Sequence, residues 1–483
     1  MTLQHLIRQA LGQELELPNV EVTGVTQDSR RVEPGNLFVA RRGAVFDGHR
    51  YIEEATRRGA VAVVGERVDP DPDTPEGIPY VRVENDKTAL AALAATFFEH
   101  PSKDLFVIGV TGTDGKTTTS FLLHHLLTGA HATGLLSTAG IRAGREDLEP
   151  EGHFTTPESS EVQRLLATFR DRGCTHAVIE ASSHGFSLHR LDEIDFDIGV
   201  WTNISPEHLD FHGTFDDYLD AKRTLIYRSR ASVLNADDGS FAKFRKATED
   251  AITYGTQPVC DWRATDILEQ PERLRFTLQR GSNEHNVDLP MVGIYNVHNA
   301  LAALAAAHLA GLPIELLLDR LASFPGVPGR MQLLQSEPFS VIVDFAHTPT
   351  ALTKALQTLR PHTEGRLILV IGAAGERDPG KRKPLGEVAA QYADLSIFTE
   401  EDSRSENTLA ILATLAEGAT ETGAMENVSF KRIPDRRDAI RTAISEAQPG
   451  DVVLLAGKGH ERTLERSSET LAWNEAAVAK RYL

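Results

Sequence analysis

The chain has 483 residues, of which 41% are hydrophobic and 25% charged, as in ordinary globular proteins. At a usual domain size of roughly 150 residues, this length predicts about three domains. The formal net charge of −19 argues against nonspecific binding to nucleic acid or anionic lipid, because both are negatively charged. The composition excludes fibrous, collagenous and disordered classes of protein.

The chain shows no sign of secretion or of membrane insertion. Its first residues lack the basic start, apolar middle and cleavage site of a signal peptide, and residues 3–11 instead carry apolar side chains at helical spacing. No apolar run reaches the roughly 18 residues of a membrane span. Two cysteines, Cys174 and Cys260, cannot form a disulfide framework. We therefore expect a cytoplasmic protein.

Three regions differ in their pattern of strands, helices and turns. Residues 22–103 mix short strands with turn signals, including the Pro/Asp-rich loop at 69–77, and predict a small α/β domain. The stretch FPGVPGR at 324–330 interrupts all periodicity and is the best linker candidate. The predicted domains are residues 1–104, 105–331 and 332–483.

The central region begins with a strand, a loop and a helix in succession. The apolar run LFVIGV at 105–110 leads into a Gly/Thr-rich turn and then the helical pattern FLLHHLL. After Pro157, apolar residues recur at helical spacing and predict a second helix. From Arg273, the alternating LRFTLQ and the turn RGSN indicate a hairpin beside the main sheet. Further strand candidates are residues 176–181, 198–204 and 231–236.

After the linker, apolar strand candidates occur with helical patterns between the earlier ones, which is typical of a parallel, Rossmann-like sheet. The candidates are residues 340–346, 366–374, 395–400 and 451–459. The sequence thus predicts an α/β fold with three domains. These are a small α/β domain, a central parallel sheet with a phosphate loop and a side hairpin, and a C-terminal Rossmann-like domain.

The segment GVTGTDGKTTT at 109–119 carries the strongest single signal. Its glycines allow backbone amides to close around phosphate oxygens, while Lys116 reaches the β- and γ-phosphates and Thr117 offers Mg²⁺ a hydroxyl. Val110 stands where the strict GxxxxGK[ST] pattern has glycine, so the match is to a variant loop. A Gly-rich turn before a helix is the simpler alternative. Because strand, loop and helix follow in the required order, we expect ATP or GTP binding.

Acidic and histidine side chains follow the later strand candidates. A Glu and a His at the carboxyl ends of parallel strands are well placed to hold a metal that faces the phosphate loop. Each alone is more often structural, but together with the loop they indicate a metal site. The segments are EASSHG at 180–185, TNISPEHLDFHG at 202–213 and YLDAK at 218–222.

These motifs resemble the Mur ligase family, whose members join a carboxylate to an amine with ATP during peptidoglycan assembly. The resemblance covers nearly the whole chain, and GIYNVHNALAA, GVPGRM and VDFAHTPTAL follow in family order at 293–303, 326–331 and 343–352. Further segments are similar to the branch of tripeptide synthetases. They are DSR at 28–30, Thr155-Thr156, and the segments at 182–190, 375–384 and 457–461.

The resemblance implies that ATP and Mg²⁺ are the cofactors. It places Mg²⁺ on Thr117, Glu180 and His208, and it implies that Lys222 carries a carbamate, an anion that bridges a second Mg²⁺ or orients the γ-phosphate. A surface lysine is the alternative for Lys222. The implied catalytic residues are Lys116, Lys222, Glu180 and His208. The implied ATP contacts are Gly112, Thr113, Asp114, Gly115, Lys116, Thr117, Thr118, Asn299 near the adenine, Arg330, and Asp344 at the ribose. His347 is a further candidate at the ribose, and a helix-cap or packing role is its alternative.

For a UDP-sugar substrate, the resemblance implies contacts from the first two domains. The residues that match family positions are Ser29, Thr155, Thr156, Ser182 and Arg190. Gln27, Phe154 and Leu188 stand where other members often carry Leu, Asn and Gln, and GAVFDG at 43–48 replaces the usual GHQADG. These departures concern the contacts to uridine and sugar.

The third domain of this branch selects a diamino acid, often through a D-N-P-R motif. The aligned residues are Glu401, Asp402, Ser403 and Arg404, so only the arginine is kept. Arg404 suits the second carboxylate of meso-diaminopimelate, whereas Asp402 favours a diamine side chain such as that of L-ornithine or L-lysine. We expect meso-diaminopimelate first and the other two close behind. The remaining contacts implied are Arg377, Gly457 and Glu461, the last suited to an ammonium group.

The implied reaction begins when the D-glutamyl γ-carboxylate of UDP-N-acetylmuramoyl-L-alanyl-D-glutamate attacks the γ-phosphate of ATP. The α-amine of the diamino acid then displaces phosphate from the acyl phosphate. Alternatives are another Mur-family or folylpolyglutamate-type ligase, a P-loop kinase, or a regulatory protein that kept the fold without turnover. We expect a monomer that binds these small molecules and neither nucleic acid nor membranes.

Overall fold

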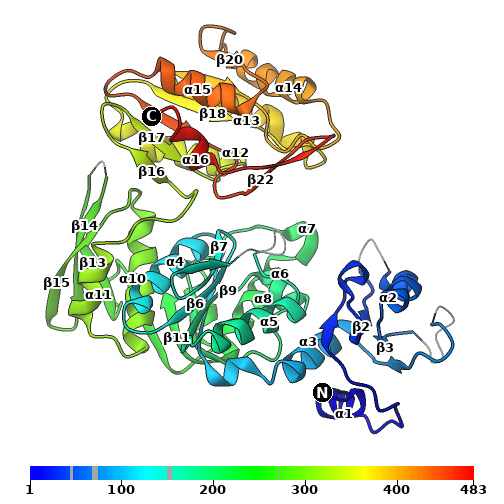
Figure 1. Ribbon diagram of the computed structural model, residues 1–483. Helices are drawn as coiled ribbons and strands as arrows, with labels where there is room; N and C mark the ends of the chain where they lie inside the picture. The colour runs from blue at the N-terminus through cyan, green and yellow to red at the C-terminus, as the bar shows by residue number, and fades with distance from the viewer. Residues whose placement is uncertain (44–46, 68–73, 149–154, 271) are drawn as a thin grey trace. The chain divides into compact units, whose positions relative to one another are not determined.

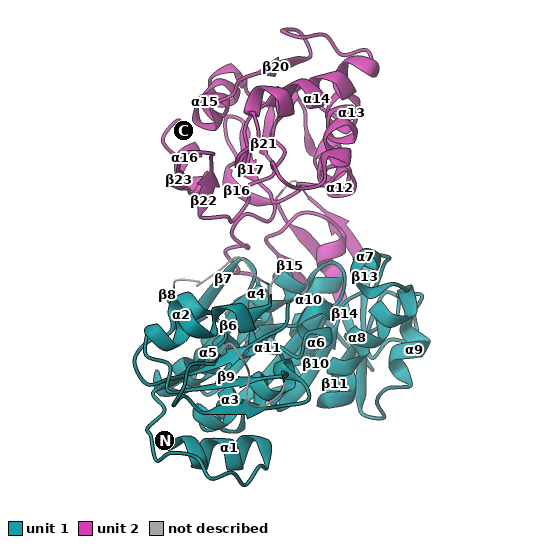
Figure 2. Ribbon diagram, turned by 90° about the vertical axis from the view of Figure 1, so that its right-hand side faces the viewer, with its two compact units in different colours: residues 1–265, 278–285, 298–321 teal, residues 266–277, 286–297, 322–483 magenta. Residues whose placement is uncertain are grey.

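A computed structural model of the chain describes residues 1–43, 47–67, 74–148, 155–270 and 272–483. Phe154 and residues 44–46 of the GAVFDG stretch lie outside the described residues. The chain forms two compact units, coloured separately in Figure 2, and each is described by itself. The first unit comprises residues 1–265, 278–285 and 298–321, and the second comprises 266–277, 286–297 and 322–483.

The N-terminal part of the first unit is a four-stranded parallel sheet in the order β1-β2-β3-β4. Every residue of β2 (Asn36–Ala40) is buried, because α1 (Leu3–Leu11) and α3 (Asp86–Phe97) cover one face and α2 (Ile52–Arg57) the other. The predicted N-terminal helix is confirmed as α1. The other elements are β1 (Gly24–Thr26), η1 (Ser29–Arg31), η2 (Gly48–Tyr51), β3 (Ala62–Gly65), β4 (Tyr80–Arg82) and η3 (Pro101–Asp104).

An eleven-stranded sheet follows, in the order β15-β14-β13-β12-β11-β10-β5-β9-β6-β7-β8. Its middle strands are parallel, and β5 (Phe106–Thr111) lies between β9 (His176–Glu180) and β10 (Phe196–Trp201). The phosphate loop connects β5 to α4 (Lys116–Thr128), as predicted. Figure 1 shows helices such as α4, α5 and α8 packed about these strands.

The remaining elements of this region include the predicted helix after Pro157, present as α5, and the predicted hairpin, present as β14 and β15. Gly281 lies between the two hairpin strands with a φ of +57°, a conformation that favours glycine. The elements are β6 (Thr133–Ser137), β7 (Gly140–Ala143), β8 (Glu146–Leu148), α5 (Ser159–Asp171), α6 (Ser183–Ser187), α7 (Leu209–His212), α8 (Phe215–Arg228), β11 (Ser229–Asn235), α9 (Phe241–Arg245), β12 (Ala251–Gly255), β13 (Trp262–Glu269), β14 (Leu274–Arg280), β15 (Asn283–Leu289), α10 (Tyr295–Leu309) and α11 (Ile314–Leu321).

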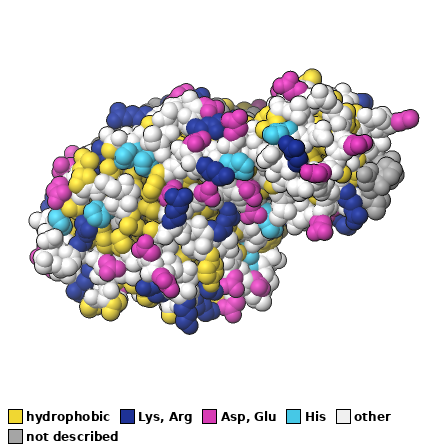
Figure 3. Space-filling view, turned by 90° about the horizontal axis from the view of Figure 1, so that it is seen from below, with side chains coloured by type: hydrophobic (Ala, Val, Ile, Leu, Met, Phe, Trp, Pro, Cys, Tyr) yellow, Lys and Arg dark blue, Asp and Glu magenta, His cyan; other side chains and the backbone are white. Residues whose placement is uncertain are grey.

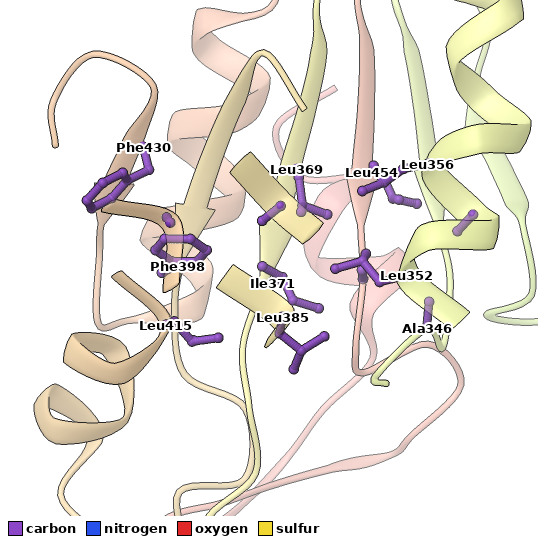
Figure 4. Close-up of a cluster of buried hydrophobic side chains, with 14 of the residues drawn as sticks. Ala346, Leu352, Leu356, Leu369, Ile371, Leu385, Phe398, Leu415, Phe430 and Leu454 are labelled. Atoms are coloured by element: carbon purple, nitrogen blue, oxygen red, sulfur yellow. The ribbon is translucent and has the colours of Figure 1, made fainter. Parts of the chain in front are cut away.

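The C-terminal part is a six-stranded sheet in the order β16-β17-β21-β18-β19-β20, parallel except for β16. Along β18 (Leu367–Ile371), Leu369 and Ile371 face the cluster drawn in Figure 4, which α12, α13 and α14 complete. Ile368 and Val370 face the opposite cluster, covered by α15 and α16. This alternation, with both faces buried, is why the strand is a continuous apolar run.

The elements of the C-terminal part agree with the four predicted strands, present as β17, β18, β19 and β21. They are β16 (Gln332–Gln335), β17 (Ser340–Val343), α12 (Pro349–Leu359), η4 (Arg360–His362), β18, η5 (Pro379–Lys381), α13 (Arg382–Tyr392), β19 (Leu395–Phe398), α14 (Thr408–Glu421), β20 (Phe430–Arg432), α15 (Arg436–Glu446), β21 (Val452–Leu455), β22 (Thr463–Glu465), β23 (Thr470–Ala472) and α16 (Glu475–Ala479).

The predicted α/β class is confirmed, with mainly parallel sheets throughout. Among the described residues, no helix combines the length and apolar character needed to cross a bilayer. On the face drawn in Figure 3, basic and acidic side chains are interspersed rather than gathered by sign.

His124 on α4 makes the stability of the first unit depend on pH. Its side chain is buried, and burial lowers its pKa from the ordinary 6.5 to about 4, with the charge of Arg142 adding to the effect. Between these values the unfolded chain binds a proton that the folded chain does not, so stability falls as the pH falls. We expect a loss of about 2 kcal/mol between pH 7 and pH 5. Urea unfolding at the two pH values measures it.

The matched comparison is His124→Gln against His5→Gln, because His5 is exposed on α1. The His124→Gln variant should lose this contribution and keep that of His176 and His184, whose pKa burial also lowers to about 4. His5→Gln should keep the whole pH dependence. An unchanged dependence in His124→Gln would show that other groups cause it.

Candidate active site

Four neighbouring parallel strands, in the order β10-β5-β9-β6, end at one edge of the central sheet. Thr202, Gly112, Glu180 and Ser137 lie at or directly beyond these ends. Ligands of open α/β sheets bind outside the carboxyl ends of the strands. This edge is therefore the candidate active site.

The phosphate loop is held open by its glycines and by the segment after β10. Gly112 has a φ of +151° and Gly115 one of +83°, and a Cβ on either would overlap the side chain of Thr202 or of Asn299, respectively. The Thr202 hydroxyl donates to the Asp114 carbonyl at 2.7 Å. The close approach requires glycine at both positions, and it leaves amides of the loop at the start of α4, where phosphate binds readily.

Lys116 begins α4 and folds its side chain back over the loop. Its Nζ donates to the carbonyl oxygens of Gly112 at 3.1 Å and Thr113 at 2.8 Å. The ammonium therefore lies at the concave side of the loop, where a nucleoside triphosphate would present its β- and γ-phosphates.

Glu180 is buried at the end of β9 and accepts three hydrogen bonds. The donors are the Thr117 hydroxyl at 2.9 Å, the Ser137 hydroxyl at 2.5 Å and the Thr138 amide at 3.0 Å. A carboxylate beside a threonine hydroxyl supplies the hard oxygen ligands that Mg²⁺ prefers. Across the described ranges, no three His, Cys, Asp or Glu side chains form a complete metal cluster. The donor set fits Mg²⁺, which commonly takes few protein ligands and completes its shell with phosphate oxygens and water.

Lys222 on α8 is 2% exposed and lies directly beside the loop. Its Nζ donates to the Gly112 carbonyl at 2.5 Å and lies 4.6 Å from the centre of the Tyr218 ring. Burial, and next the charge of Lys116, hold the pKa of Lys222 well below its ordinary value, although nearby carboxylates oppose this. The structure thus places a buried amine, rather than a surface lysine, beside the phosphate loop.

His208 is 48% exposed and has a φ of +54° immediately before α7. Its Nε2 lies 3.7 Å from a Glu207 carboxylate oxygen, and its ring packs edge-on against His184 at 4.8 Å. In the part of the chain described, no hydrogen bond joins His208 to Glu180 or Thr117. The structure therefore brings Thr117, Glu180 and Lys222 to the loop and leaves His208 outside their hydrogen-bond network.

Three of the residues predicted for the UDP-sugar lie together beyond β9. The Thr156 hydroxyl is 2.9 Å from the Ser182 hydroxyl, and Arg190 donates to the Thr156 carbonyl at 3.0 Å. Sequence reasoning missed Glu158, which pairs with Arg190 at 2.7 Å and also with Arg41 of the N-terminal part. The sequence feature that could have indicated Glu158 is its position two residues after the Thr155-Thr156 pair.

The other residues predicted for the UDP-sugar are more scattered. Gln27 accepts a hydrogen bond from Ser160 at 2.6 Å, which links the N-terminal part to α5. Ser29 is buried and donates to Glu54 at 3.1 Å. Leu188 caps the end of α6, and Thr155 is half-buried.

Asn299, predicted near the adenine, is buried against the phosphate loop, with its side-chain oxygen 3.4 Å from the Thr119 hydroxyl. In the second unit, the Arg330 guanidinium lies 4.8 Å from the centre of the Phe345 ring. Asp344 accepts hydrogen bonds from the amides of Met331 at 2.7 Å and Ala346 at 2.8 Å, and burial raises its pKa against the effect of Arg330.

The GVPGRM and GKGHE segments of the second unit pack against each other at two glycines. Gly329 and Gly459 both have positive φ, and a Cβ on Gly329 would overlap the backbone of Gly459 and His460. This contact brings the residue before Arg330 against Gly459 and His460 of the GKGHE segment. His347 is the further alternative for the ribose, and its Nδ1 lies 2.8 Å from the Phe345 carbonyl of the same loop.

The residues predicted for the amino acid surround a lysine that sequence reasoning missed. Lys458 is fully buried, and its Nζ lies 2.8 Å from Asp402 and 2.5 Å from Glu461. The GKGHE motif contains this lysine, so its place between two glycines was the available signal. Arg404 pairs with Glu465, a second residue that was missed. Ser403 and Glu401 are buried, Gly457 approaches Glu401, and Arg377 is exposed.

A phosphate loop at the carboxyl edge of a parallel sheet, with a buried carboxylate and a buried amine beside it, defines a protein that handles nucleotide phosphates. Three family descriptions match the chain. They are the Mur ligase family catalytic domain over residues 21–98, the Mur ligase middle domain over 110–307, and the Mur ligase glutamate ligase domain over 329–459.

Individual relatives match over nearly the whole chain. A UDP-N-acetylmuramyl-tripeptide synthetase of Deinococcus radiodurans is 51% identical and covers 96% of this chain and 95% of its own. A UDP-N-acetylmuramyl-tripeptide synthetase of Roseiflexus is 43% identical, and the match covers 99% of this chain and 98% of the Roseiflexus protein. A solved structure described as UDP-N-acetylmuramoyl-L-alanyl-D-glutamate–2,6-diaminopimelate ligase superposes with a TM-score of 0.69 at 30% identity. The match covers 100% of this chain and 99% of that one. The chain belongs to the Mur ligase family.

Proposed function

We propose that the protein is an ATP- and Mg²⁺-dependent ligase that adds a diamino acid to UDP-N-acetylmuramoyl-L-alanyl-D-glutamate in the synthesis of peptidoglycan precursors. The observation that carries the proposal is the pairing of Thr117 with the buried Glu180 carboxylate directly beside the phosphate loop. The names of the relatives support the tripeptide-synthetase branch rather than a folylpolyglutamate-type ligase.

Several residues beside the phosphate loop act in the first step, the transfer of the γ-phosphoryl group to the substrate carboxylate. When bound, Mg-ATP would supply the γ-phosphate that activates the substrate carboxylate, and the metal would neutralise charge on the phosphate oxygens. Lys116 binds and orients the phosphates. Thr117 and Glu180 would be the metal's protein ligands, and both lie on rigid elements, at the start of α4 and the end of β9. Phosphoryl transfer depends mainly on positioning and charge neutralisation, so the chain needs no nucleophile of its own.

Lys222 is suited to carry a carbamate because its amine is buried and its pKa is low. The neutral amine is the form that attacks CO₂, and the addition forms one N–C bond and releases one proton. The resulting anion would offer oxygen ligands next to Gly112, to whose carbonyl the Lys222 amine donates its hydrogen bond.

The remaining site residues complete the proposal. Arg190, Thr156 and Ser182 bind the UDP-sugar end, and Asn299, Arg330 and Asp344 contact the nucleotide. His208 is the weakest metal candidate, because it lies outside the hydrogen bonds of Glu180. We assign residues 1–104 to the UDP-sugar, 105–331 to ATP and 332–483 to the amino acid. We place the protein in the cytoplasm as a monomer without nucleic-acid or membrane partners.

The test incubates the purified protein with ATP, Mg²⁺ and UDP-N-acetylmuramoyl-L-alanyl-D-glutamate. It offers meso-diaminopimelate, L-lysine and L-ornithine separately and measures phosphate release and product mass. Formation of a tripeptide product with at least one of them is the expected result. No product with any of the three, in a preparation that still binds ATP, would reject the proposal.

A further inference from the structure

The residues predicted for the amino acid gather where three neighbouring parallel strands of the second unit end. In the order β21-β18-β19, these strands lead into Gly457, Gly375 and Glu401, respectively. The carboxyl edge of this sheet is thus a ligand-binding position in its own right. The charges placed there determine which amino acid it accepts.

Arg404, the residue kept from the D-N-P-R motif, is already bound to a carboxylate of the chain. Its Nε donates to a Glu465 carboxylate oxygen at 2.8 Å, and its Nη1 donates to the Gly375 carbonyl at 2.7 Å. The Arg404 amide also donates to the Glu465 carbonyl at 3.1 Å, which fixes the two residues side by side. A second carboxylate from a ligand would have to displace Glu465 from this guanidinium.

Glu465 is held from its other side as well. Its amide donates to Asp402 at 2.9 Å, and the same carboxylate oxygen of Asp402 accepts from the buried Lys458 at 2.8 Å. Lys458 also pairs with Glu461. Both Lys458 and Arg404 therefore have carboxylate partners within the chain, and neither cation is available without breaking an ion pair.

The Glu401 carboxylate, in contrast to these cations, has an oxygen without a hydrogen-bond partner in the described structure. The residue is 6% exposed, and its Oε2 has no hydrogen-bond partner within the described residues. Gly457, with a φ of +100°, lies against this oxygen, because a Cβ there would be only 2.8 Å from it, and glycine therefore offers it no side-chain donor. A buried carboxylate oxygen without a donor is costly, so a ligand that brings an N–H donor or a cation would gain from it.

Arg377 is exposed and, within the described ranges, forms no ion pair. It is thus available for one ligand carboxylate, the α-carboxylate that every diamino acid has. The edge offers one unpaired guanidinium and one unpartnered carboxylate oxygen. This combination matches an amino acid with one carboxylate and a terminal ammonium group.

We propose that Glu465 is a specificity-determining residue that occupies Arg404 in place of a substrate carboxylate. The site then selects a diamino acid with a simple terminal ammonium, such as L-lysine or L-ornithine, over meso-diaminopimelate, and Glu401 accepts the ammonium. This inference rests on the proposed function. It reverses the order expected from the sequence, in which Arg404 alone favoured the second carboxylate.

The experiment measures kcat/KM of tripeptide formation with each of the three diamino acids in the wild type, Glu465→Gln and Glu469→Gln. The wild type should prefer L-lysine or L-ornithine. Glu465→Gln should shift the ratio toward meso-diaminopimelate by about tenfold or more, because a charge-assisted, bidentate contact to Arg404 becomes available. Glu469 is the matched control, since it pairs with Arg466 at 3.4 Å near the same pair of strands and should leave the ratio unchanged.

A second variant, Glu401→Gln, tests the ammonium acceptor. It should raise KM for the preferred amino acid by about tenfold and change kcat less, since Glu401 binds rather than reacts. Circular dichroism confirms that each variant is folded.

The outcomes separate the two proposals. A wild type that prefers meso-diaminopimelate, or an unchanged ratio in folded Glu465→Gln, would overturn the role of Glu465 and leave the ligase assignment standing. Absence of product with all three amino acids would reject the ligase assignment itself.

Discussion

Replacement of Lys116 by Met is expected to lower the rate of tripeptide formation by about a thousandfold. The Lys116 ammonium folds back over the concave side of the phosphate loop, at 2.8 Å from the Thr113 carbonyl. Its charge would stabilise the phosphate oxygens as the γ-phosphoryl group is transferred. Losing one such preorganised donor in a partly buried site typically costs a factor of 10²–10³, and a charged donor lies at the upper end.

The measurement is kcat for phosphate release with all substrates present. The matched control is Lys243→Met on α9, because Lys243 is half-exposed and pairs with Asp216 at 2.6 Å, away from the phosphate loop. That variant should retain wild-type turnover. A Lys116→Met variant that is folded and active would place the nucleotide elsewhere in the protein.

Lys222→Arg is expected to abolish most of the activity although arginine is also a long, basic side chain. Burial and the charge of Lys116 lower the pKa of Lys222, so the wild-type amine is neutral enough to react with CO₂. Arginine remains protonated in proteins and cannot form a carbamate. If the carbamate holds the metal or the γ-phosphate, turnover should fall by about 10²-fold or more.

Two readouts check this expectation. One is kcat of the variant, and the other is the carbamate resonance of the wild type in ¹³C NMR under labelled CO₂. The resonance should be present in the wild type and in Lys243→Met and absent from Lys222→Arg. Full activity in Lys222→Arg would mean that a cation, and not a carbamate, acts at this position.

The phosphate loop and the Glu180 carboxylate could be predicted because their signals are local. Strand, glycines, Lys116 and Thr117 follow one another within a short segment, and Glu180 directly ends an apolar strand. The alternation of buried residues likewise located the strands of the Rossmann-like sheet. The strand expected at 198–204 ends earlier, at Trp201, because Thr202 turns toward the loop and donates to its carbonyls.

The charge pairs of the site could not be predicted, because they join distant segments. Arg404 and Glu465 are 61 residues apart, and Arg41 and Glu158 are 117 apart. Glu465 lies in the three-residue strand β22, too short for its alternation to be distinguished from a loop. Without the partner, the sequence presented Arg404 as a free guanidinium, and this is why it favoured meso-diaminopimelate.

The path of the chain between the two compact units bears on how parts of this protein can be exchanged. The chain passes from one unit to the other at 265/266, 277/278, 285/286, 297/298 and 321/322. Four of the crossings fall within β13, β14, β15 and α10, so these elements contribute residues to both units, and the fifth directly follows α11. By strand pairing, however, β13, β14 and β15 belong to the eleven-stranded sheet, so a chimera that takes the amino-acid specificity of a relative should keep residues 266–297 with the central sheet. A single crossover in the Gly/Pro-rich linker at 324–330 would leave both the eleven-stranded and the six-stranded sheet whole.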